Sequence, residues 1–269
     1  MTALRSAKSA PHNMAIITSY FKGEKFIREC QRIGCRVILL TQEKLLNANW
    51  PRDAIEDVYT MPDLQNRDHV INGVSFLARK VIFDNIVALD DFDVEMAATL
   101  REHLRLPGMG ESTARRFRDK LAMRMRAKDL GIRVPEFIHV LNHHQLSEFL
   151  HSVPAPWVLK PRFQASAIGI KKIEAAEQFW QTAETLGDQQ SFHLLERFVP
   201  GDIYHVDSIV YESTVQFTAI QKYMLPPMSV AHEGGIFASC SLERGAPEEP
   251  ILRSLNDRVI TQFELEQGV

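Results

Sequence analysis

Short apolar runs alternate with amphipathic stretches in the N-terminal part of the chain. Residues 14–41 read MAIITSYFKGEKFIRECQRIGCRVILLT, in which apolar runs at 14–17 and 37–40 flank a helical pattern that ends at Gly34. Strands buried on both faces read as continuous apolar runs, and parallel strands need a crossover connection that is usually a helix. The segment therefore predicts a βαβ unit with parallel strands.

The same alternation continues further along the chain. A strand is expected in DVYTMP, a helix over 68–79, a strand in NIVALD and a helix in FDVEMAATLREHL. The turn-rich stretch LPGMGES at 106–112 marks the boundary that follows. We therefore expect a disordered tail over 1–13, a small Rossmann-like α/β domain over 14–110 and a second domain over 111–269.

The second domain begins with one expected helix and then becomes rich in strands. Ser112 is a suitable N-cap for a helix over 113–130, which Gly131 would end. Strand-like segments follow in PEFIHV, WVLKP, IGIKKI, FHLLERF, IYHVDSIVY and VQFTAIQKYM, with helices expected near 142–152 and 174–187. Successive strands with few helices between them favour an antiparallel sheet. This domain is expected to be α+β.

Composition excludes several classes of partner and compartment. The net charge of −3 provides no basic field for nucleic acid or a membrane surface. No run of about 18 apolar residues predicts a membrane-spanning helix, and residues 1–13 lack the apolar core of a secretory signal. The three cysteines form no CxxC pair, which favours buried thiols in a reducing, cytoplasmic protein.

The stretch WVLKPRFQASAIGIKK, residues 157–172, has the pattern of an anion site. An apolar strand runs into Lys160, and small residues follow before two further lysines. A lysine ammonium pairs with phosphate oxygens, and the N–H groups of a tight small-residue loop add donors. The alternative is an edge-strand lysine followed by a surface turn. The glycine-rich fingerprints GxGxxG and GxxxxGK[ST] are both absent.

Two more stretches extend this pattern. FRDKLAMRMRAKDLGIRVPEF places Lys120 in a helix that leads to a strand, and LLERFVPGDIYHVDSIV places Asp202 after a Pro-Gly turn between strands. These stretches, in this order around 157–172, resemble the ATP-grasp superfamily, most of all its carboxylase-like carboxylate ligases. The resemblance covers nearly the whole chain and implies a pre-ATP-grasp α/β domain followed by an α+β ATP-grasp domain.

The resemblance also implies a set of ATP-binding residues. The two lysines would hold the phosphates, the loop 164–169 would close over them, the hinge 196–199 would face adenine, and Asp202 would accept from the ribose hydroxyls. A hinge supplies backbone groups for a base edge, and a carboxylate makes charge-assisted bonds to hydroxyls. The residues so assigned are Lys120, Lys160, Gln164, Ser166, Ala167, Gly169, Glu196, Arg197, Phe198, Val199 and Asp202. On this interpretation, substituting Lys160 would weaken nucleotide binding and leave the unliganded protein as stable as before.

The sequence departs from the superfamily at the metal site. Members hold Mg²⁺ through late carboxylates that include a carboxylate-x-Asn pair, and this sequence contains no Glu-x-Asn or Asp-x-Asn. The chain is therefore expected to be a fragment that stops before the metal-binding strands and is inactive by itself, with its catalytic residues unknown. The full-length protein would be an ATP-dependent carboxylate–amine or carboxylase-like ligase that acts on small molecules through an acyl phosphate. The alternative is a non-catalytic nucleotide-binding or regulatory module, and a homodimer stays open as the assembly state.

Other polar groups have simpler interpretations beside the functional ones. The acids of LDDFD at 89–93 favour the N-terminus of the next helix more than a metal site. AHEGGIF at 231–237 fits a hairpin connection about as well as a substrate loop or a metal site. His143 and His144 are expected to lie on the solvated surface. Three arginines could touch phosphate, but facing water is the favoured interpretation: Arg115, Arg116 and Arg118.

Overall fold

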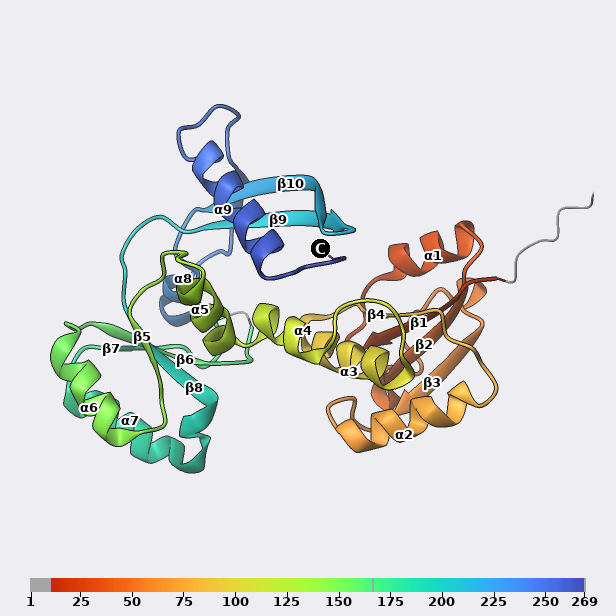
Figure 1. The fold of residues 1–269 in the computed structure, drawn as a ribbon, viewed down its shortest axis with the longest axis horizontal. Coiled ribbons are helices and arrows are strands. Elements are labelled where there is room, and N and C mark those ends of the chain that lie inside the picture. Colours follow the sequence, from red (N-terminus) through yellow and green to blue (C-terminus); the bar gives the residue numbers. More distant parts are fainter. Residues whose placement is uncertain (1–10, 166, 269) are drawn as a thin grey trace, which may run out of the picture. The chain divides into compact units, whose positions relative to one another are not determined.

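The computed structural model describes residues 11–165 and 167–268 (Figure 1). The chain forms two compact units, the first ending at Ala114 and the second beginning at Arg115. Most of the tail expected over 1–13 falls outside the described residues. Asn13 does not belong to it, because this residue begins the first strand and its N–H donates to Asp84 Oδ2 at 2.7 Å.

The first unit contains the parallel sheet that the apolar runs predict. Its strand order is β3-β2-β1-β4, and every neighbouring pair is parallel. The strands are β1 (Asn13–Thr18), β2 (Arg36–Gln42), β3 (Asp57–Met61) and β4 (Asn85–Ala88). Ile16 and Ile17 on β1 point to opposite faces of the sheet and are both fully buried. This two-sided burial explains why the central strands are apolar throughout rather than alternating.

Helices cover both faces of this sheet. They are α1 (Glu24–Arg32), α2 (Arg67–Ala78) and α3 (Val94–Leu104). Ile27 of α1 packs with Ile16 in one apolar cluster. Val70 of α2 and Leu100 of α3 pack with Ile17 in the other cluster. The first unit is therefore a doubly wound α/β domain, as expected from the sequence.

Gly23, directly before α1, has a left-handed backbone and little space around it. Its φ is 83°, and a Cβ at this position would lie 2.3 Å from Leu89 Cδ1. We expect Gly23→Ala to lower the free energy of unfolding of the first unit by roughly 2–3 kcal/mol, because the left-handed backbone costs about 1–2 kcal/mol and overpacking adds to it. Gly34→Ala is a matched control, since Gly34 has φ 90° but a Cβ added there would meet no atom within 4 Å. Urea unfolding followed by circular dichroism measures both, and equal losses would contradict the role of Leu89.

The second unit begins with two helices where one was expected over 113–130. They are α4 (Glu111–Arg118) and α5 (Lys120–Asp129). Asp119 separates them in an extended conformation, with φ −84° and ψ 109°, and its carboxylate accepts from Leu121 N–H. Asp119 is thus an N-cap that starts a new helix. Ser112 lies inside α4 and is not the cap that the sequence suggested.

An antiparallel sheet of order β5-β8-β6-β7 follows these helices. Its strands are β5 (Phe137–His139), β6 (Trp157–Pro161), β7 (Lys171–Ile173) and β8 (His193–Arg197). The helices α6 (His143–Ser152) and α7 (Ala176–Leu186) lie where the sequence predicts them. Leu146 of α6 and Phe179 of α7 pack against Trp157, Leu159 and Leu195 on one face of the sheet.

A separate antiparallel sheet of order β11-β10-β9 corrects the expectation of a single strand layer. It comprises β9 (Tyr204–Tyr211), β10 (Thr214–Tyr223) and β11 (Ser239–Ser241), with helices α8 (Pro227–Glu233) and α9 (Glu249–Gln262). The Pro200-Gly201 turn separates β8 from β9, so the chain leaves one sheet before it enters the next. Gly234 and Gly235 follow α8 and lie in the connection between the antiparallel neighbours β10 and β11, which is longer than a tight hairpin turn because it contains α8.

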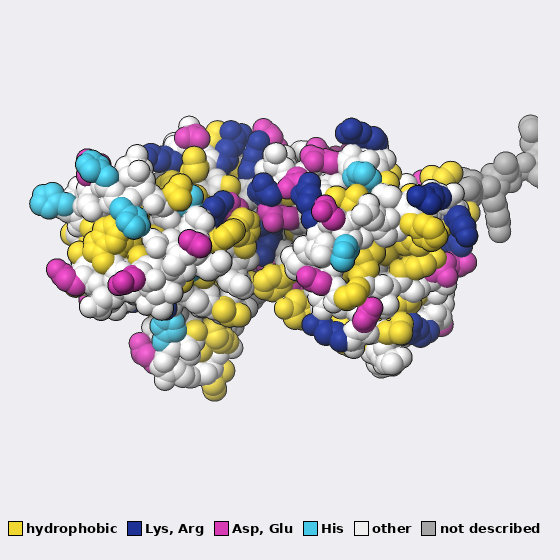
Figure 2. Space-filling view, turned by 90° about the horizontal axis from the view of Figure 1, so that it is seen from below, with side chains coloured by type: hydrophobic (Ala, Val, Ile, Leu, Met, Phe, Trp, Pro, Cys, Tyr) yellow, Lys and Arg dark blue, Asp and Glu magenta, His cyan; other side chains and the backbone are white. Residues whose placement is uncertain are grey.

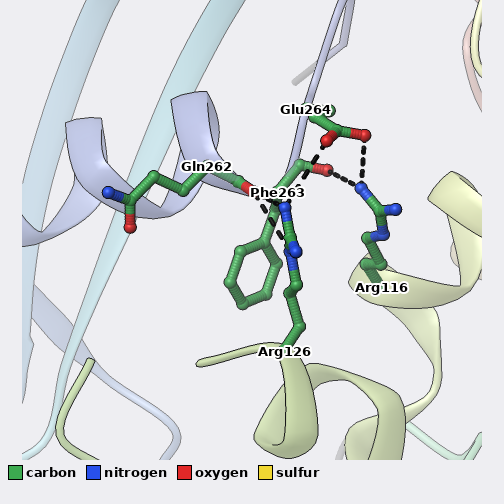
Figure 3. Close-up of polar contacts among 5 residues, drawn as sticks. All are labelled: Arg116, Arg126, Gln262, Phe263 and Glu264. Carbon is green, nitrogen blue, oxygen red and sulfur yellow. Dashed lines mark hydrogen bonds and ion pairs between the residues drawn. The ribbon is translucent and has the colours of Figure 1, made fainter. Parts of the chain in front are cut away.

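Two arginines hold the C-terminal end of α9 (Figure 3). Arg126 donates to Gln262 O at 2.7 and 3.2 Å, and Arg116 donates to Phe263 O at 3.3 Å and Glu264 Oε2 at 2.5 Å. The last carbonyls of a helix lack intrahelical partners, and cations there complement the helix dipole. Arg116 therefore has a structural contact and does not simply face water.

The surface of the described residues is mixed in charge, and the cysteines differ in burial. Among the described residues, no helix is long and apolar enough to cross a membrane. On the face drawn in Figure 2, cationic and anionic side chains lie interspersed among apolar ones. Cys30 is buried, which raises the pKa of its thiol to about 11, whereas Cys240 is exposed. The expectation of buried thiols is therefore wrong for Cys240.

Candidate functional site

Lys160, the residue that first suggested an anion site, pairs with Glu196 on the neighbouring strand. Lys160 lies opposite Leu194, and Glu196 lies opposite Val158, in the antiparallel pair β6–β8. The two side chains are therefore diagonal neighbours on one face of the sheet, the face away from α6 and α7. Lys160 Nζ donates to Glu196 Oε1, and Arg124 Nε of α5 donates to Glu196 Oε2 at 3.0 Å.

Glu196 is a buried carboxylate held between two cations. Its side chain is 5% exposed. Burial raises the pKa of the Glu196 carboxyl, but Arg124 and Lys160 lower it by more, so the pKa lies below its ordinary value. Lys160 thus has an ion-pair partner without any ligand. From this contact we now expect substitution of Lys160 to lower the stability of the unliganded protein, since it would leave Glu196 with one cation fewer.

Lys120 is different, because it has no carboxylate partner among the residues that the structure describes. It is the first residue of α5, is half-buried, and its Nζ donates to the Gln164 carbonyl. Burial and the charges of Arg118, Lys160 and Arg124 lower the pKa of the Lys120 ammonium. Three cations therefore act on the Lys120 ammonium. Among the described residues, the contact found for this ammonium is the Gln164 carbonyl. An anion bound there would relieve their mutual repulsion.

The small-residue loop joins β6 to β7 beside Lys120. Ala167 and Gly169 both have left-handed backbones, with φ 59° and 72°. A Cβ on Gly169 would lie 2.9 Å from Pro161 Cγ, so a larger residue there would collide with the end of β6. Ile168 N–H donates to Ala165 O at 3.2 Å, which closes a turn. Ser166, predicted from the sequence to contact phosphate, lies outside the described residues.

The residues assigned to the hinge follow Glu196 directly. Arg197 is the last residue of β8, and its Nη1 lies 3.6 Å from Glu136 Oε1. The N–H of Phe198 donates to Pro156 O at 3.0 Å. Val199 is 60% exposed. Asp202 Oδ2 accepts from Lys222 Nζ of β10 at 2.5 Å. Val199 and the carboxylate of Asp202 are thus exposed, whereas the Phe198 N–H is already paired.

Four residues of this cluster were not assigned to it from the sequence. Arg118 Nη2 donates to Phe163 O at 2.9 Å, and Arg162 Nε donates to Asp119 Oδ1 at 2.9 Å. Arg124 contacts Glu196, as described. Burial raises the pKa of the Asp119 carboxyl, but Arg162 and the N–H groups of Leu121 and Ala122 outweigh it, so this pKa lies below its usual range. The sequence signal for these residues was the run RRFRDKLAMRMR at 115–126, which is rich in arginine.

The acids of LDDFD have local partners in the first unit. Asp90 Oδ1 accepts from Phe92 N–H at 2.9 Å, and its other oxygen pairs with Lys22. Asp93 is fully buried and accepts from Ser19 N–H at 2.6 Å and from Ser19 Oγ at 2.5 Å. Within the described part of the chain, no three His, Cys, Asp or Glu side chains come together to hold a metal ion. Asp90 thus caps the short turn before α3, whereas Asp93, the residue before α3, accepts from Ser19 and not from the N-terminus of that helix.

Sequence comparison finds relatives among ATP-dependent ligases. Residues 27–108 match the model of the ATP-grasp N-terminal domain. An L-arginine-specific L-amino acid ligase of Bacillus subtilis is 25% identical over 192 residues, which are 69% of this chain. The match covers 46% of that relative, so the chain spans about half the length of the curated ligase.

Solved structures with the same fold extend over almost the whole chain. L-amino acid ligase from Bacillus licheniformis matches 97% of this chain and 62% of its own, with a TM-score of 0.75 and 18% identity. N5-carboxyaminoimidazole synthetase from Staphylococcus aureus, solved in complex with ADP, matches 98% of this chain and 67% of its own, with a TM-score of 0.70 and 14% identity.

The two kinds of comparison agree with the observed architecture. A parallel four-stranded α/β unit is followed by two antiparallel sheets, where the sequence predicted one antiparallel layer. The family model falls on the first unit, and the structural matches include both units. The chain is thus similar to ATP-grasp proteins over residues 27–108, and its fold is that of the L-amino acid ligase and N5-carboxyaminoimidazole synthetase structures.

Proposed function

We propose that this chain binds the phosphates of ATP at Lys120 and Lys160, under the loop 164–169. The observation that carries the proposal is the ammonium of Lys120, which is half-buried, surrounded by other cations and without a carboxylate partner among the described residues. A phosphate group is an anion with several acceptor oxygens, so it matches both the charge and the donors of this cluster. Gln164, Ala167 and Gly169 line the loop, to which Ser166 also belongs.

The rest of the nucleotide is assigned to the hinge and the turn after it. The backbone of Glu196, Arg197, Phe198 and Val199 would face the adenine edge. The N–H groups of Arg197 and Phe198 now donate to Glu136 O and Pro156 O, so they would have to be shared or released. Asp202 would accept from the ribose hydroxyls, for which its pairing with Lys222 would have to open or be shared. The buried side chain of Glu196 stays with Lys160 and Arg124 in this arrangement.

The whole protein is proposed to be an ATP-dependent carboxylate–amine or carboxylase-like ligase. A carboxylate oxygen would attack the γ-phosphorus, ADP would leave, and the acyl phosphate would form. An amine nitrogen would then attack the acyl carbon, phosphate would leave, and the amine would lose a proton. Similarity to L-amino acid ligases supports small carboxylate and amine substrates. Magnesium in nucleotide sites is usually held by one or two carboxylates together with substrate phosphates, so ATP itself would supply part of its ligands.

A second candidate function is a nucleotide-binding or regulatory module without catalysis. The departure of this sequence from the carboxylate-x-Asn pair of the superfamily supports this candidate. A phosphate-release assay with a panel of carboxylates and amines separates the candidates. Turnover that depends on both substrates and is lost on Lys120→Gln would establish the ligase, and binding without turnover would establish the module.

Lys120→Gln tests the nucleotide site itself. We expect ATP to bind about tenfold more weakly to this variant, because a charge-assisted contact to phosphate is lost, and a factor of ten corresponds to about 1.4 kcal/mol. Isothermal titration calorimetry with ATP and ADP at fixed salt measures the effect. Lys128→Gln is the matched control, since Lys128 is an exposed lysine of the same helix whose Nζ lies 5.9 Å from the Phe137 ring centroid. Equal affinities of the two variants would refute the assignment.

A further inference from the structure

The break between α4 and α5 is joined to the end of β6 by a buried ion pair. Asp119 is 2% exposed, and Arg162 donates to both of its carboxylate oxygens, from Nε at 2.9 Å and from Nη2. The same carboxylate caps α5 through Leu121 N–H at 3.0 Å. A bidentate guanidinium–carboxylate pair fixes direction as well as distance. Asp119 therefore sets both where α5 begins and where Arg162 lies.

Arg162 is in turn fixed to the segment directly before β8, the strand next to β6. Its Nη1 donates to Ser191 O at 3.1 Å, and its backbone N–H donates to Phe192 O at 2.9 Å. Its guanidinium lies 5.2 Å from the centroid of the Phe163 ring. Because Arg162 follows β6 directly, these contacts hold the start of the small-residue loop in one place.

The carbonyls of residues 162–164, which connect β6 to the loop 164–169, accept hydrogen bonds from the residues where α4 ends and α5 begins. Arg162 O accepts from Lys120 N–H at 3.0 Å, Phe163 O accepts from Arg118 Nη2 at 2.9 Å, and Gln164 O accepts from Lys120 Nζ. Residues 118–120 and 162–164 thus meet in a fixed register, 44 residues apart in the sequence at Lys120 and Gln164. The register determines where the Lys120 ammonium lies relative to the loop and to Lys160.

We propose that Asp119 and Arg162 form a positioning pair that sets the Lys120 ammonium against the loop 164–169 and so determines nucleotide affinity, without touching the nucleotide. The inference rests on the proposed function, because it assigns the pair to the ATP-binding cluster. Asp119 acts through its neighbour Lys120, and Arg162 acts through the carbonyls that Lys120 contacts. Both carboxylate oxygens of Asp119 accept from Arg162, and the Arg162 guanidinium also donates to Ser191 O. We therefore do not expect either side chain to contact the phosphates.

Asp119→Asn separates this role from helix capping. Asparagine is as good an N-cap as aspartate, so α5 still starts at the same place, but the charged bidentate contact with Arg162 is lost. We expect ATP affinity to fall roughly tenfold in calorimetry, since residues of one network couple strongly. In a Lys120→Gln background the same substitution should have almost no further effect, because the lysine through which it acts is gone. Independent losses that add would overturn the positioning role.

A second variant and a control keep the test decisive. Arg162→Lys retains the positive charge and loses the fork, so it should weaken ATP binding in the same direction even if Asp119→Asn folds poorly. Glu264→Gln is the control, since Glu264 pairs with Arg116 and Arg126 of the same two helices and should leave ATP affinity unchanged. If the unmodified chain binds ATP but Arg162→Lys and Asp119→Asn bind it equally well, the pairing proposal alone fails. If the unmodified chain binds no ATP, the proposed function fails together with it.

Discussion

Glu196→Gln is expected to lower the free energy of unfolding of the second unit by roughly 3 kcal/mol, because removing one partner of a buried ion pair costs about 3–5 kcal/mol. The lower end applies here, since the side chains of Lys160 and Arg124 are 20% and 24% exposed and water can reach them. Glutamine preserves the volume of glutamate and leaves two cations facing each other without a carboxylate. Urea unfolding followed by circular dichroism and tryptophan fluorescence measures the loss.

The pH dependence of stability should change in the same variant. The pKa of the Glu196 carboxyl is lower in the folded chain than in the unfolded chain, whose reference value is about 4.3. Its contribution to stability is therefore fully present above about pH 4.3 and is lost as the pH falls through the lower folded value. Unmodified protein should lose stability on acidification below about pH 4.3 more steeply than Glu196→Gln.

Glu136→Gln is the matched control for this prediction. Glu136 is 56% exposed and lies 3.6 Å from Arg197, the residue that follows Glu196. Exposed pairs of this kind contribute about 0–1 kcal/mol, so this variant should unfold almost like the unmodified chain. Equal losses in both variants would mean that the buried Glu196 contributes no more to stability than an exposed glutamate. Lys160 could then have a role in ligand binding alone.

Phe263→Ala is expected to lower the free energy of unfolding of the second unit by about 3–5 kcal/mol, as for other buried phenylalanines. Phe263 is 2% exposed and packs with Ala127 and Ile132, and its ring centroid lies 5.8 Å from that of Phe117. The ring therefore anchors the end of α9 to α4 and α5. Its loss should also expose the Val210 amide, which donates to Gly268 O at 2.9 Å, to hydrogen exchange.

Glu264→Gln separates the ring from the polar contacts around it. Glu264 is 58% exposed in its ion pairs with Arg116 and Arg126, so this substitution should cost less than about 1 kcal/mol. Slow exchange at Val210 should persist in this variant and disappear in Phe263→Ala. A larger loss in Glu264→Gln than in Phe263→Ala would mean that the arginine clamp, rather than the apolar contact, holds α9.

The local signals in the sequence determined most of the first unit and the order of the elements in the second. Continuous apolar runs at 14–17 and 37–40 predicted parallel strands, since burial on both faces leaves no place for alternation. The helices at 142–152 and 174–187 followed from periodicity, which depends only on residues a few positions apart. The motif order also indicated the resemblance to ATP-grasp proteins that the family match over residues 27–108 supports.

The tertiary structure decided the roles of the charged residues. From sequence, 113–130 reads as one helix, but Asp119 breaks it, because Arg162 on a distant strand end compensates its buried carboxylate. Lys160 reads as a ligand-facing cation, but the register of β6 and β8 places it diagonally opposite Glu196. The sequence of a strand shows which of its residues share a face. Its register against the neighbouring strand depends on the packing of the whole sheet, and Glu196 lies 36 positions after Lys160 in the sequence. The partners of buried charges therefore follow from the fold and not from the local pattern.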